Sequence, residues 1–434
     1  MSVNKILIKG GHVIDPSKGR NAKADLLVEG NEIAAIGDHL SVEGAEVIDA
    51  AGCTVTPGFV DLHVHLREPG FEYKEDIASG TRAAARGGFT SVVCMPNTSP
   101  VIDDETGVRF VLDRAARDGV VRVYPAGAVT KGQKGQEIAE MGLMARAGAR
   151  MFSDDGLPVI SARVMSTALT YSTMFGVPIS THEEDPSLAG DGAVNFGRIS
   201  TLMGLPGMPE EAETIMIARD LELCRRVGGH LHIGHVSTAR SIELIAAAKA
   251  DGVSVTCEVT PHHLTLTEDL VKESGYDTNT KMKPPLRTEA DRRALIVALR
   301  DGIIDVVATD HAPHSFDDKD KEYTFADNGI TGLETAFALL HDRLVLPGDI
   351  SLDRLIECLT TAPARIIGID GGTLCEGAAA DIAILKTDQE WAVNPGKFAS
   401  KGRNTPLVGW SLTGKVDTVL VDGRIVLRGG ELTC

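Results

Sequence analysis

The middle of this 434-residue chain alternates between short apolar runs and helix-like segments, and this rhythm constrains the fold more than any other feature. Eight apolar runs read as strands: Phe59–His65, Thr90–Met95, Val121–Val129, Arg150–Ser153, Val177–His182, His230–His235, Val253–Val259 and Ile304–Asp310. Segments rich in Ala, Leu, Glu and Arg lie between most of them, with apolar residues every three or four positions: Lys74–Arg86, Glu105–Arg117, Glu211–Val227, Ala239–Ala250, Glu289–Arg300 and Gly332–His341. This alternation predicts a TIM-like (β/α)8 barrel; one strand fewer would leave an open, doubly wound sheet.

Both ends of the chain show a different pattern, of short strands separated by turn residues. The expected strands are Ile6–Ile8, Asp25–Val28, Ile33–Ile36 and Val47–Ile48 near the start, and Asp381–Leu385, Val416–Val421 and Ile425–Leu427 near the end, with Asp422-Gly423 as a hairpin turn. Each end alone has few strands with which to close a core. We therefore expect residues 1–54 and 366–434 to form one small β-sandwich domain beside a barrel over residues 55–365.

Charge and hydropathy exclude several classes of partner. The formal net charge of −18 argues against nucleic acid, whose phosphates need a basic surface. No apolar run approaches the ~20 residues that span a bilayer, and the N-terminus lacks the layout of a signal peptide. The seven cysteines are scattered, as is usual for reduced thiols. We expect a soluble, cytoplasmic protein with no membrane partner.

Metal-ligand side chains stand at the ends of five of the predicted strands, where barrels of this kind place their catalytic groups. The residues are His63, His65, Asp155, His182, His235 and Asp310. His63 and His65 are two positions apart, so in a strand their side chains point the same way. Chance could supply two or three such residues, whereas six indicate a metal centre.

Imidazole and carboxylate without thiolate is a donor set typical of catalytic zinc. Four histidines and two aspartates exceed the needs of one tetrahedral ion, and two ions bridged by Asp155 would use them all. The alternative is one ion, with Asp155 outside its coordination sphere. Asp154 and Asp155 exchange roles if the strand ends one residue early. Zinc lowers the pKa of a bound water to ~7, which suits hydrolysis.

The remaining histidines have other expected roles. We expect structural roles for His230 and His232, a site-lining or hydrogen-bonding role for His262 and His263, packing outside the barrel for His311, and surface positions for His12, His39 and His341.

Arg67, Asn97 and His314 lie just beyond ligands or strand ends and are candidate substrate-binding residues. A guanidinium binds a carboxylate bidentately, and an amide adds orientation. The alternatives are a salt bridge from Arg67 to Glu68 and a turn role for Asn97 after Pro96. The charged stretch Ser315–Tyr323 is a candidate mobile lid, with a solvated surface loop as its alternative.

Four strings of residues carry a family resemblance: Asp61–Gly70 (DLHVHLREPG), Met95–Thr98 (MPNT), Lys281–Arg287 (KMKPPLR) and Ala308–His314 (ATDHAPH). They resemble the signatures of dihydroorotases in the amidohydrolase superfamily, in particular the longer bacterial type I form, and the likeness runs over nearly the whole chain.

The resemblance implies a zinc-dependent hydrolase that interconverts dihydroorotate and N-carbamoyl-L-aspartate in de novo pyrimidine biosynthesis. His63, His65 and Asp310 would bind one zinc, and His182 and His235 the other. Asp155 would stand where related amidohydrolases have a carboxylated lysine; this chain has no lysine between Lys134 and Lys249. Asp310 would be the catalytic base and then acid, while Arg67, Asn97 and His314 would hold the substrate.

Two departures from the family pattern concern substrate contacts. Lys283 replaces an Asn that some members have, and Ala326-Asp327-Asn328-Gly329 replaces a Pro-Phe-Gly-like string. Lys283, Asn328 and Gly329 are expected at the substrate, through side chain or backbone.

Two other functions stay open from the sequence. One is another cyclic amidohydrolase, a hydantoinase or allantoinase, although those usually carry the bridging lysine. The other is a non-catalytic partner subunit of aspartate transcarbamoylase, although such homologues have lost metal ligands. A homodimer and a complex with aspartate transcarbamoylase are the assemblies considered.

Overall fold

The eight predicted barrel strands form one parallel sheet in the computed structural model, which describes residues 4–433. In sequence order they are β6 (Phe59–Val64), β7 (Phe89–Cys94), β8 (Arg122–Gly127), β9 (Met151–Ser153), β10 (Ile179–Thr181), β13 (Leu231–Ile233), β14 (Val255–Val259) and β15 (Val306–Val307). Each strand pairs with its neighbours in the sequence, as the right-handed β-α-β repeat requires.

The sheet closes between its first and last strands. Val64 at the end of β6 forms a parallel bridge with His311, just beyond β15, and the backbone N–H of His65 donates to the His311 carbonyl at 2.9 Å. Buried Asp61 adds to this seam, because its carboxylate accepts hydrogen bonds from the backbone N–H groups of His63 (3.0 Å) and Thr309 (3.1 Å). The predicted (β/α)8 barrel is confirmed, and the open-sheet alternative is wrong.

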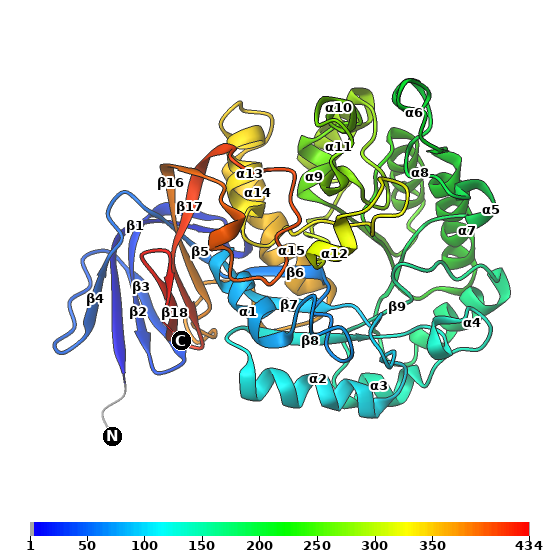
Figure 1. Ribbon diagram of the computed structural model, residues 1–434. Coiled ribbons are helices and arrows are strands. Elements are labelled where there is room, and N and C mark those ends of the chain that lie inside the picture. Colours follow the sequence, from blue (N-terminus) through cyan, green and yellow to red (C-terminus); the bar gives the residue numbers. More distant parts are fainter. Residues whose placement is uncertain (1–3, 434) are drawn as a thin grey trace.

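Helices surround the barrel (Figure 1). They are α1 (Ile77–Arg86), α2 (Glu105–Asp118), α3 (Met141–Ala147), α4 (Ala162–Ser172), α5 (Pro186–Ala189), α6 (Arg198–Met203), α7 (Glu211–Val227), α8 (Ala239–Ala250), α9 (Pro261–Thr265), α10 (Asp269–Glu273), α11 (Glu289–Arg300), α12 (Phe316–Lys319), α13 (Ala336–Leu340), α14 (Leu352–Leu359) and α15 (Thr361–Ile366). Short strands β11 (Val194–Asn195) and β12 (Gly207–Met208) pair with each other. No helix in residues 4–433 is long and apolar enough to cross a membrane.

Helices α7, α8 and α11 have the predicted bounds, α2 ends one residue later than predicted, and two others differ more. Helix α1 begins three residues later than expected, because Asp76 caps it by accepting a hydrogen bond from the Ser79 N–H at 2.7 Å. Helix α13 begins at Ala336 and continues as a π-helical turn, His341–Val345. In this turn His341 is buried, stacked on Phe337 and donating from Nδ1 to the Thr413 carbonyl at 2.9 Å, so its expected surface position is wrong.

The two chain ends share one nine-stranded sheet, with blue N-terminal and red C-terminal strands side by side in Figure 1. Its strands are β1 (Lys5–Asp15), β2 (Arg20–Glu29), β3 (Glu32–Gly37), β4 (Glu46–Asp49), β5 (Thr54–Pro57), β16 (Ile382–Ala392), β17 (Ser411–Val421), β18 (Arg424–Arg428) and β19 (Glu431–Leu432). The ends join where β5 pairs antiparallel with β16. The predicted β domain from both termini is confirmed, while its boundaries at residues 54 and 366 stay a prediction.

The hairpin turn between β17 and β18 has the chemistry that the sequence predicts. Asp422 and Gly423 both have positive φ, 47° and 68°, as a type I′ turn requires. A Cβ on Gly423 would lie 2.0 Å from the Gly30 carbonyl oxygen, so no larger residue fits there.

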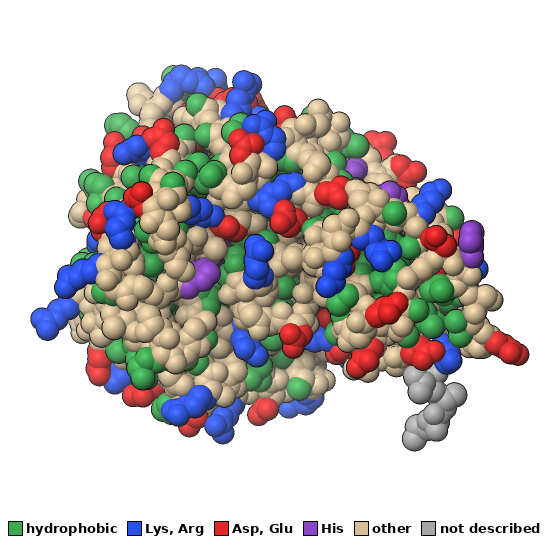
Figure 2. All heavy atoms as spheres, turned by 180° about the vertical axis from the view of Figure 1, so that it is seen from behind, with side chains coloured by type: hydrophobic (Ala, Val, Ile, Leu, Met, Phe, Trp, Pro, Cys, Tyr) green, Lys and Arg blue, Asp and Glu red, His purple; other side chains and the backbone are tan. Residues whose placement is uncertain are grey.

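The β domain is joined to the barrel by ionic contacts and by an apolar cluster in which Val416 and Val419 of β17 meet the barrel's aromatic residues. Phe59, where the chain enters the barrel, packs edge-on against Phe89 with ring centroids 5.6 Å apart, and it also packs against Phe337. Arg122 of β8 donates to the carboxylates of Asp381 and Asp422, which flank the β-domain strands. Elsewhere, acidic and basic side chains are interspersed over the face shown in Figure 2.

Replacing Arg122 with Gln is expected to lower the free energy of unfolding by about 1–3 kcal/mol, because the buried Asp381 carboxylate loses its charged partner. Urea unfolding followed by tryptophan fluorescence measures the effect, since Trp391 and Trp410 both lie in the C-terminal segment of the β domain. The control is Arg117→Gln, a side chain 63% exposed and paired with Asp118, which should change stability by less than ~0.5 kcal/mol. Equal effects of the two substitutions would contradict the structural role of Arg122.

Candidate metal centre and active site

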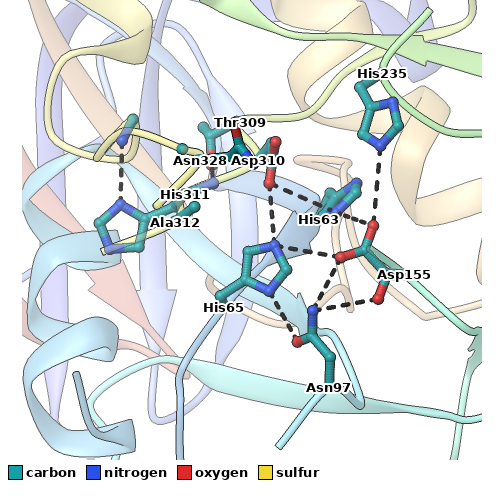
Figure 3. Close-up of polar contacts among 12 residues, drawn as sticks. His63, His65, Asn97, Asp155, His235, Thr309, Asp310, His311, Ala312 and Asn328 are labelled. Carbon is teal, nitrogen blue, oxygen red and sulfur yellow. Dashed lines mark hydrogen bonds and ion pairs between the residues drawn. The ribbon is translucent and has the colours of Figure 1, made fainter. Parts of the chain in front are cut away.

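The six predicted ligands converge at the C-terminal ends of the barrel strands. His63 and His65 come from the end of β6, while Asp155, His182, His235 and Asp310 follow β9, β10, β13 and β15 within three residues. All are buried or nearly so. Figure 3 shows His63, His65, His235 and Asp310 arranged around the carboxylate of Asp155.

Asp155 lies at the middle of the cluster. Its Oδ1 is 3.1 Å from His63 Nε2 and 3.9 Å from His235 Nε2, and its Oδ2 is 3.5 Å from His65 Nε2. Asp310 Oδ1 lies 3.1 Å from His65 Nε2. His182 joins on the far side, with its Nδ1 2.9 Å from His235 Nε2. The ligand atoms therefore form two overlapping groups that share His63 and meet at Asp155.

These residues fit a divalent cation. His63, Asp155 and His235 can bring one ligand atom each within 4.8 Å of one another, and so can His63, His65 and Asp310. His63 Nε2 is buried and has no hydrogen-bond partner among residues 4–433, although carboxylates surround it. An atom of this kind is suited to bind a metal ion.

The electrostatics of the cluster point the same way. Burial alone would lower the pKa of His63, but the carboxylates of Asp155, Glu258 and Asp310 outweigh it and hold that pKa well above its ordinary value. Burial would raise the pKa of Asp155, but the neighbouring histidines hold it well below its usual range. Burial and the nearby His182 lower the pKa of His235 to about 3. The carboxylates of the cluster thus favour a positive charge among them, which a divalent cation would supply.

Three residues at the centre have left-handed backbone conformations that non-glycine residues rarely adopt. Their φ angles are 60° at Arg67, 31° at His235 and 47° at Asp310. Such conformations cost of order 1–3 kcal/mol each and cluster at functional sites. Here they occur at two ligands and at the predicted carboxylate-binding arginine.

Asn97 holds two of the ligands. His65 donates from Nδ1 to Asn97 Oδ1 at 3.0 Å, and Asn97 Nδ2 donates to the Asp155 carboxylate at 3.2 Å (Figure 3). Asn97 therefore does more than form a turn, because its side chain contacts two of the ligands. The same side chain lines the adjoining cavity.

A cavity of about 380 Å³ opens beside the cluster and brings the predicted substrate-binding residues together. Besides the ligands, it is lined by Arg67, Asn97, Lys283, His314, Asn328 and Gly329. Arg67 is held by its Nε, which donates to the Pro313 carbonyl at 3.3 Å, and its Nη2 lies 3.4 Å from His314 Nε2. The alternative salt bridge to Glu68 is absent among the described residues, since Glu68 pairs with Arg114 at 2.6 Å.

His314 is fixed as a neutral imidazole. Burial lowers its pKa to about 4, its Nε2 donates to the Asn328 carbonyl at 2.8 Å, and Lys74 Nζ lies 3.3 Å from its Nδ1. Gly329 follows with a φ of 114°, and a Cβ there would lie 2.5 Å from that of Ala312. The cavity wall at this point is therefore formed by the main chain of Asn328 and Gly329, which the His314 side chain holds in place.

Lys283 joins the cavity wall to the metal cluster. Its Nζ donates to Glu184 Oε1 at 2.8 Å, and Glu184 Oε2 lies 3.5 Å from His182 Nε2. Burial raises the pKa of Glu184, but His182 and Lys283 outweigh it and bring it down to about 2. Glu184 and Glu258 are not among the predicted site residues, yet Glu258 Oε1 is 2.6 Å from His63 Nδ1. The sequence holds a signal for each of them. Glu184 follows the predicted ligand His182 by two residues, and Glu258 is a charged residue inside the apolar run Val253–Val259.

The segment after β15 is held by two buried lysines, although most side chains of Ser315–Tyr323 are exposed, as the surface-loop alternative predicts. Buried Lys319 donates from Nζ to the carbonyls of Asp327 (2.7 Å) and Gly329 (3.1 Å). Buried Lys281 similarly donates to the carbonyls of Thr324 (2.8 Å) and Ala326 (2.7 Å). Burial lowers the pKa of Lys319 to about 7.

The other histidines take supporting positions. His263 bonds Thr260 Oγ1 and the Pro284 carbonyl, while His262 is buried beside it. His311 packs behind the strand ends, 3.4 Å from Glu75. His230 and His232 both contact Thr256 Oγ1 at 2.8 Å.

Comparison with known proteins names the family. A family model described as dihydro-orotase-like matches residues 52–241. The chain is 50% identical over 424 residues to a dihydroorotase of Syntrophotalea carbinolica, covering 98% of this chain and 99% of that protein. It is 51% identical to a dihydroorotase of Pelotomaculum thermopropionicum with the same coverage.

Among solved structures, an L-hydantoinase (dihydropyrimidinase) from Arthrobacter aurescens has a TM-score of 0.90 and 28% identity, over 99% of this chain and 97% of that one. A dihydropyrimidinase from Brevibacillus agri has a TM-score of 0.86 and 25% identity, over 99% and 96%. These likenesses support the barrel with its β domain. Because about half of all residues are shared with dihydroorotases over almost the full length of both chains, this protein belongs to the dihydroorotase family.

Proposed function

We propose that this protein is a zinc-dependent dihydroorotase, acting in the cytoplasm in de novo pyrimidine (UMP) biosynthesis. It hydrolyses the cyclic amide of dihydroorotate to N-carbamoyl-L-aspartate and catalyses the reverse cyclisation. One observation carries the proposal: a partly buried arginine lines the same cavity as five of the six predicted metal ligands, in a chain half identical to dihydroorotases.

The metal centre is proposed to use all six ligands. His63, His65 and Asp310 would hold one ion, His182 and His235 would hold the second, and Asp155 would be a ligand of both. The central position of Asp155, within 3.1–3.9 Å of three imidazoles, supports two ions over one. The donor set favours zinc. When bound, the metal polarises the scissile carbonyl and makes water a nucleophile at neutral pH.

Asp310 is the proposed general base and acid. Burial would raise its pKa, but His63 and His65 outweigh burial and hold that pKa below its ordinary value, so the carboxylate is ionised at neutral pH. It takes the proton from the attacking water and delivers it to the ring nitrogen as the amide bond breaks. Asp310, with its left-handed backbone, lines the cavity.

Arg67 is proposed to bind the substrate carboxylate, which orients the ring for attack. The backbone around Asn328 and Gly329, held by His314, then faces the ring amide, and Asn97 keeps His65 and Asp155 in place. Lys283 adds a positive charge to the same wall, where its pairing with Glu184 holds it in place.

The structural likeness to a hydantoinase makes hydantoin the second candidate substrate. Hydantoin has no carboxylate for Arg67, and this chain lacks a lysine that could bridge two metals, so dihydroorotate fits the site better. Retention of all six ligand residues argues against a non-catalytic subunit. Light scattering of the protein, alone and mixed with aspartate transcarbamoylase, distinguishes a monomer, a homodimer and a complex.

The purified protein is expected to contain up to two zinc ions per chain. It is also expected to hydrolyse dihydroorotate in preference to hydantoin and allantoin. Dialysis against a chelator should abolish turnover, and added zinc should restore it. Elemental analysis with a spectrophotometric assay of all three substrates measures this. Zinc-loaded protein that turns over hydantoin and leaves dihydroorotate untouched would refute the proposal.

Asp310→Asn is expected to lower kcat by ~10²–10⁴-fold or more, because the amide cannot accept the proton from water. Circular dichroism should show an unchanged fold. The matched control is Asp317→Asn in α12, an exposed aspartate seven residues further on, which should retain wild-type kcat. Near-normal turnover by the Asp310 variant would remove it from the proton transfer.

Arg67→Gln is expected to lower kcat/KM for dihydroorotate by roughly 10–150-fold, mostly through a higher KM, since a charged hydrogen bond to the substrate is lost (about 1.5–3 kcal/mol). Steady-state kinetics measure this, with Arg109→Gln, an exposed arginine of α2, as the control. A changed kcat with an unchanged KM would instead assign Arg67 to the chemical step.

A further inference from the structure

A buried glutamate, Glu258, lies on β14. The neighbouring strands β13 and β15 each end in a proposed metal ligand, whereas β14 does not. Its side chain is 1% exposed, and its carboxylate contacts β6 and β13 within the barrel, directly behind the metal cluster. The catalytic scheme above gives it no task. A charged group in the interior of a barrel is costly unless fully hydrogen-bonded, so its contacts need an explanation.

Both oxygens of Glu258 are engaged. Oε1 lies 2.6 Å from His63 Nδ1 and accepts from the backbone N–H of His235 at 3.3 Å. Oε2 lies 3.0 Å from His232 Nε2. Oε1 thus contacts a residue from each of the two proposed ion sites, one through its imidazole and one through its backbone.

The direction of these hydrogen bonds fixes the tautomer of His63. An ionised carboxylate can only accept, so the Nδ1 of His63 must carry the proton that faces Glu258. In the neutral imidazole with its proton on Nδ1, His63 Nε2 is the atom with the free lone pair. This is the atom that lies 3.1 Å from Asp155 and has no hydrogen-bond partner among the described residues.

His232 extends the same logic one residue further. With Nε2–H donated to Glu258, its Nδ1 can only accept, and Thr256 Oγ1 is 2.8 Å away to donate. The Thr256 hydroxyl in turn accepts from His230 Nε2 at 2.8 Å. Every donor in this chain meets an acceptor, so His232 has one orientation and holds Glu258 in one position.

We propose that Glu258 is a positioning residue of the metal centre: it holds His63 with Nε2 toward the ions and fixes the His235 backbone, and His232 supports it. An apolar layer would fill a barrel interior equally well, so packing alone does not call for this carboxylate. Carboxylates that accept from the far nitrogen of a ligand histidine orient the ring and strengthen its binding to metal. The inference rests on the metal centre of the proposed function.

The test is the affinity of the protein for Co²⁺, added as a spectroscopic probe to metal-free enzyme and competed against a chelator. Glu258→Gln keeps the size and removes the charge, and it is expected to weaken Co²⁺ binding about 10–100-fold. The control is Glu213→Gln, a buried glutamate of α7 that bonds Ser237 and Ser241 and touches none of the six ligand side chains; it should bind Co²⁺ with wild-type affinity.

The outcomes separate the two ideas. Wild-type Co²⁺ affinity in folded Glu258→Gln would overturn the positioning role and leave the metal centre intact. Failure of the wild-type protein to bind Co²⁺ or Zn²⁺ would instead refute the proposed metal centre itself. If Glu258→Gln does not fold, His232→Leu decides: it leaves Glu258 in place with one donor fewer, and it should weaken Co²⁺ binding several-fold. Unchanged affinity in that variant would overturn the proposal.

Discussion

Closure of the barrel between its first and last strands is the constraint on which the site depends. The hydrogen bond from His65 N–H to the His311 carbonyl and the capture of the Thr309 N–H by Asp61 join segments about 250 positions apart in the chain. That seam brings His65 Nε2 to 3.1 Å from Asp310, 245 positions later. Without it, the proposed base and the ligands from β6 would belong to different edges of an open sheet.

Behind the seam, the barrel is stabilised by polar contacts as well as by apolar layers. Carboxylates alternate with imidazoles from the cavity inward: Asp310, His65, Asp155, His63, Glu258 and His232. Each carboxylate in this series therefore has an imidazole neighbour, which is the condition for tolerating charges in a core. The same alternation keeps the carboxylates ionised and thus able to hold a cation.

The sequence was sufficient for the barrel, for the joined termini and for the convergence of the six ligand residues. Strand periodicity and the shared edge of parallel strands set these features, and both are visible in one chain. Glu258 and Glu184 were missed for a physical reason. The partner of Glu258 lies 195 positions away, and only the stagger of strands around the closed barrel decides that they meet. The late start of α13 and the burial of His341 likewise follow from packing against β17, which local propensity does not encode.

Two buried lysines, Lys281 and Lys319, hold one wall of the cavity in place. Lys281 and Lys319 grip residues 324–329 entirely through main-chain oxygens, which every residue type supplies equally. The position of that wall is consequently independent of most side chains within it. The main chain therefore sets the contour offered to the substrate, and Gly329 leaves no room for a side chain there, because a Cβ would lie 2.5 Å from that of Ala312.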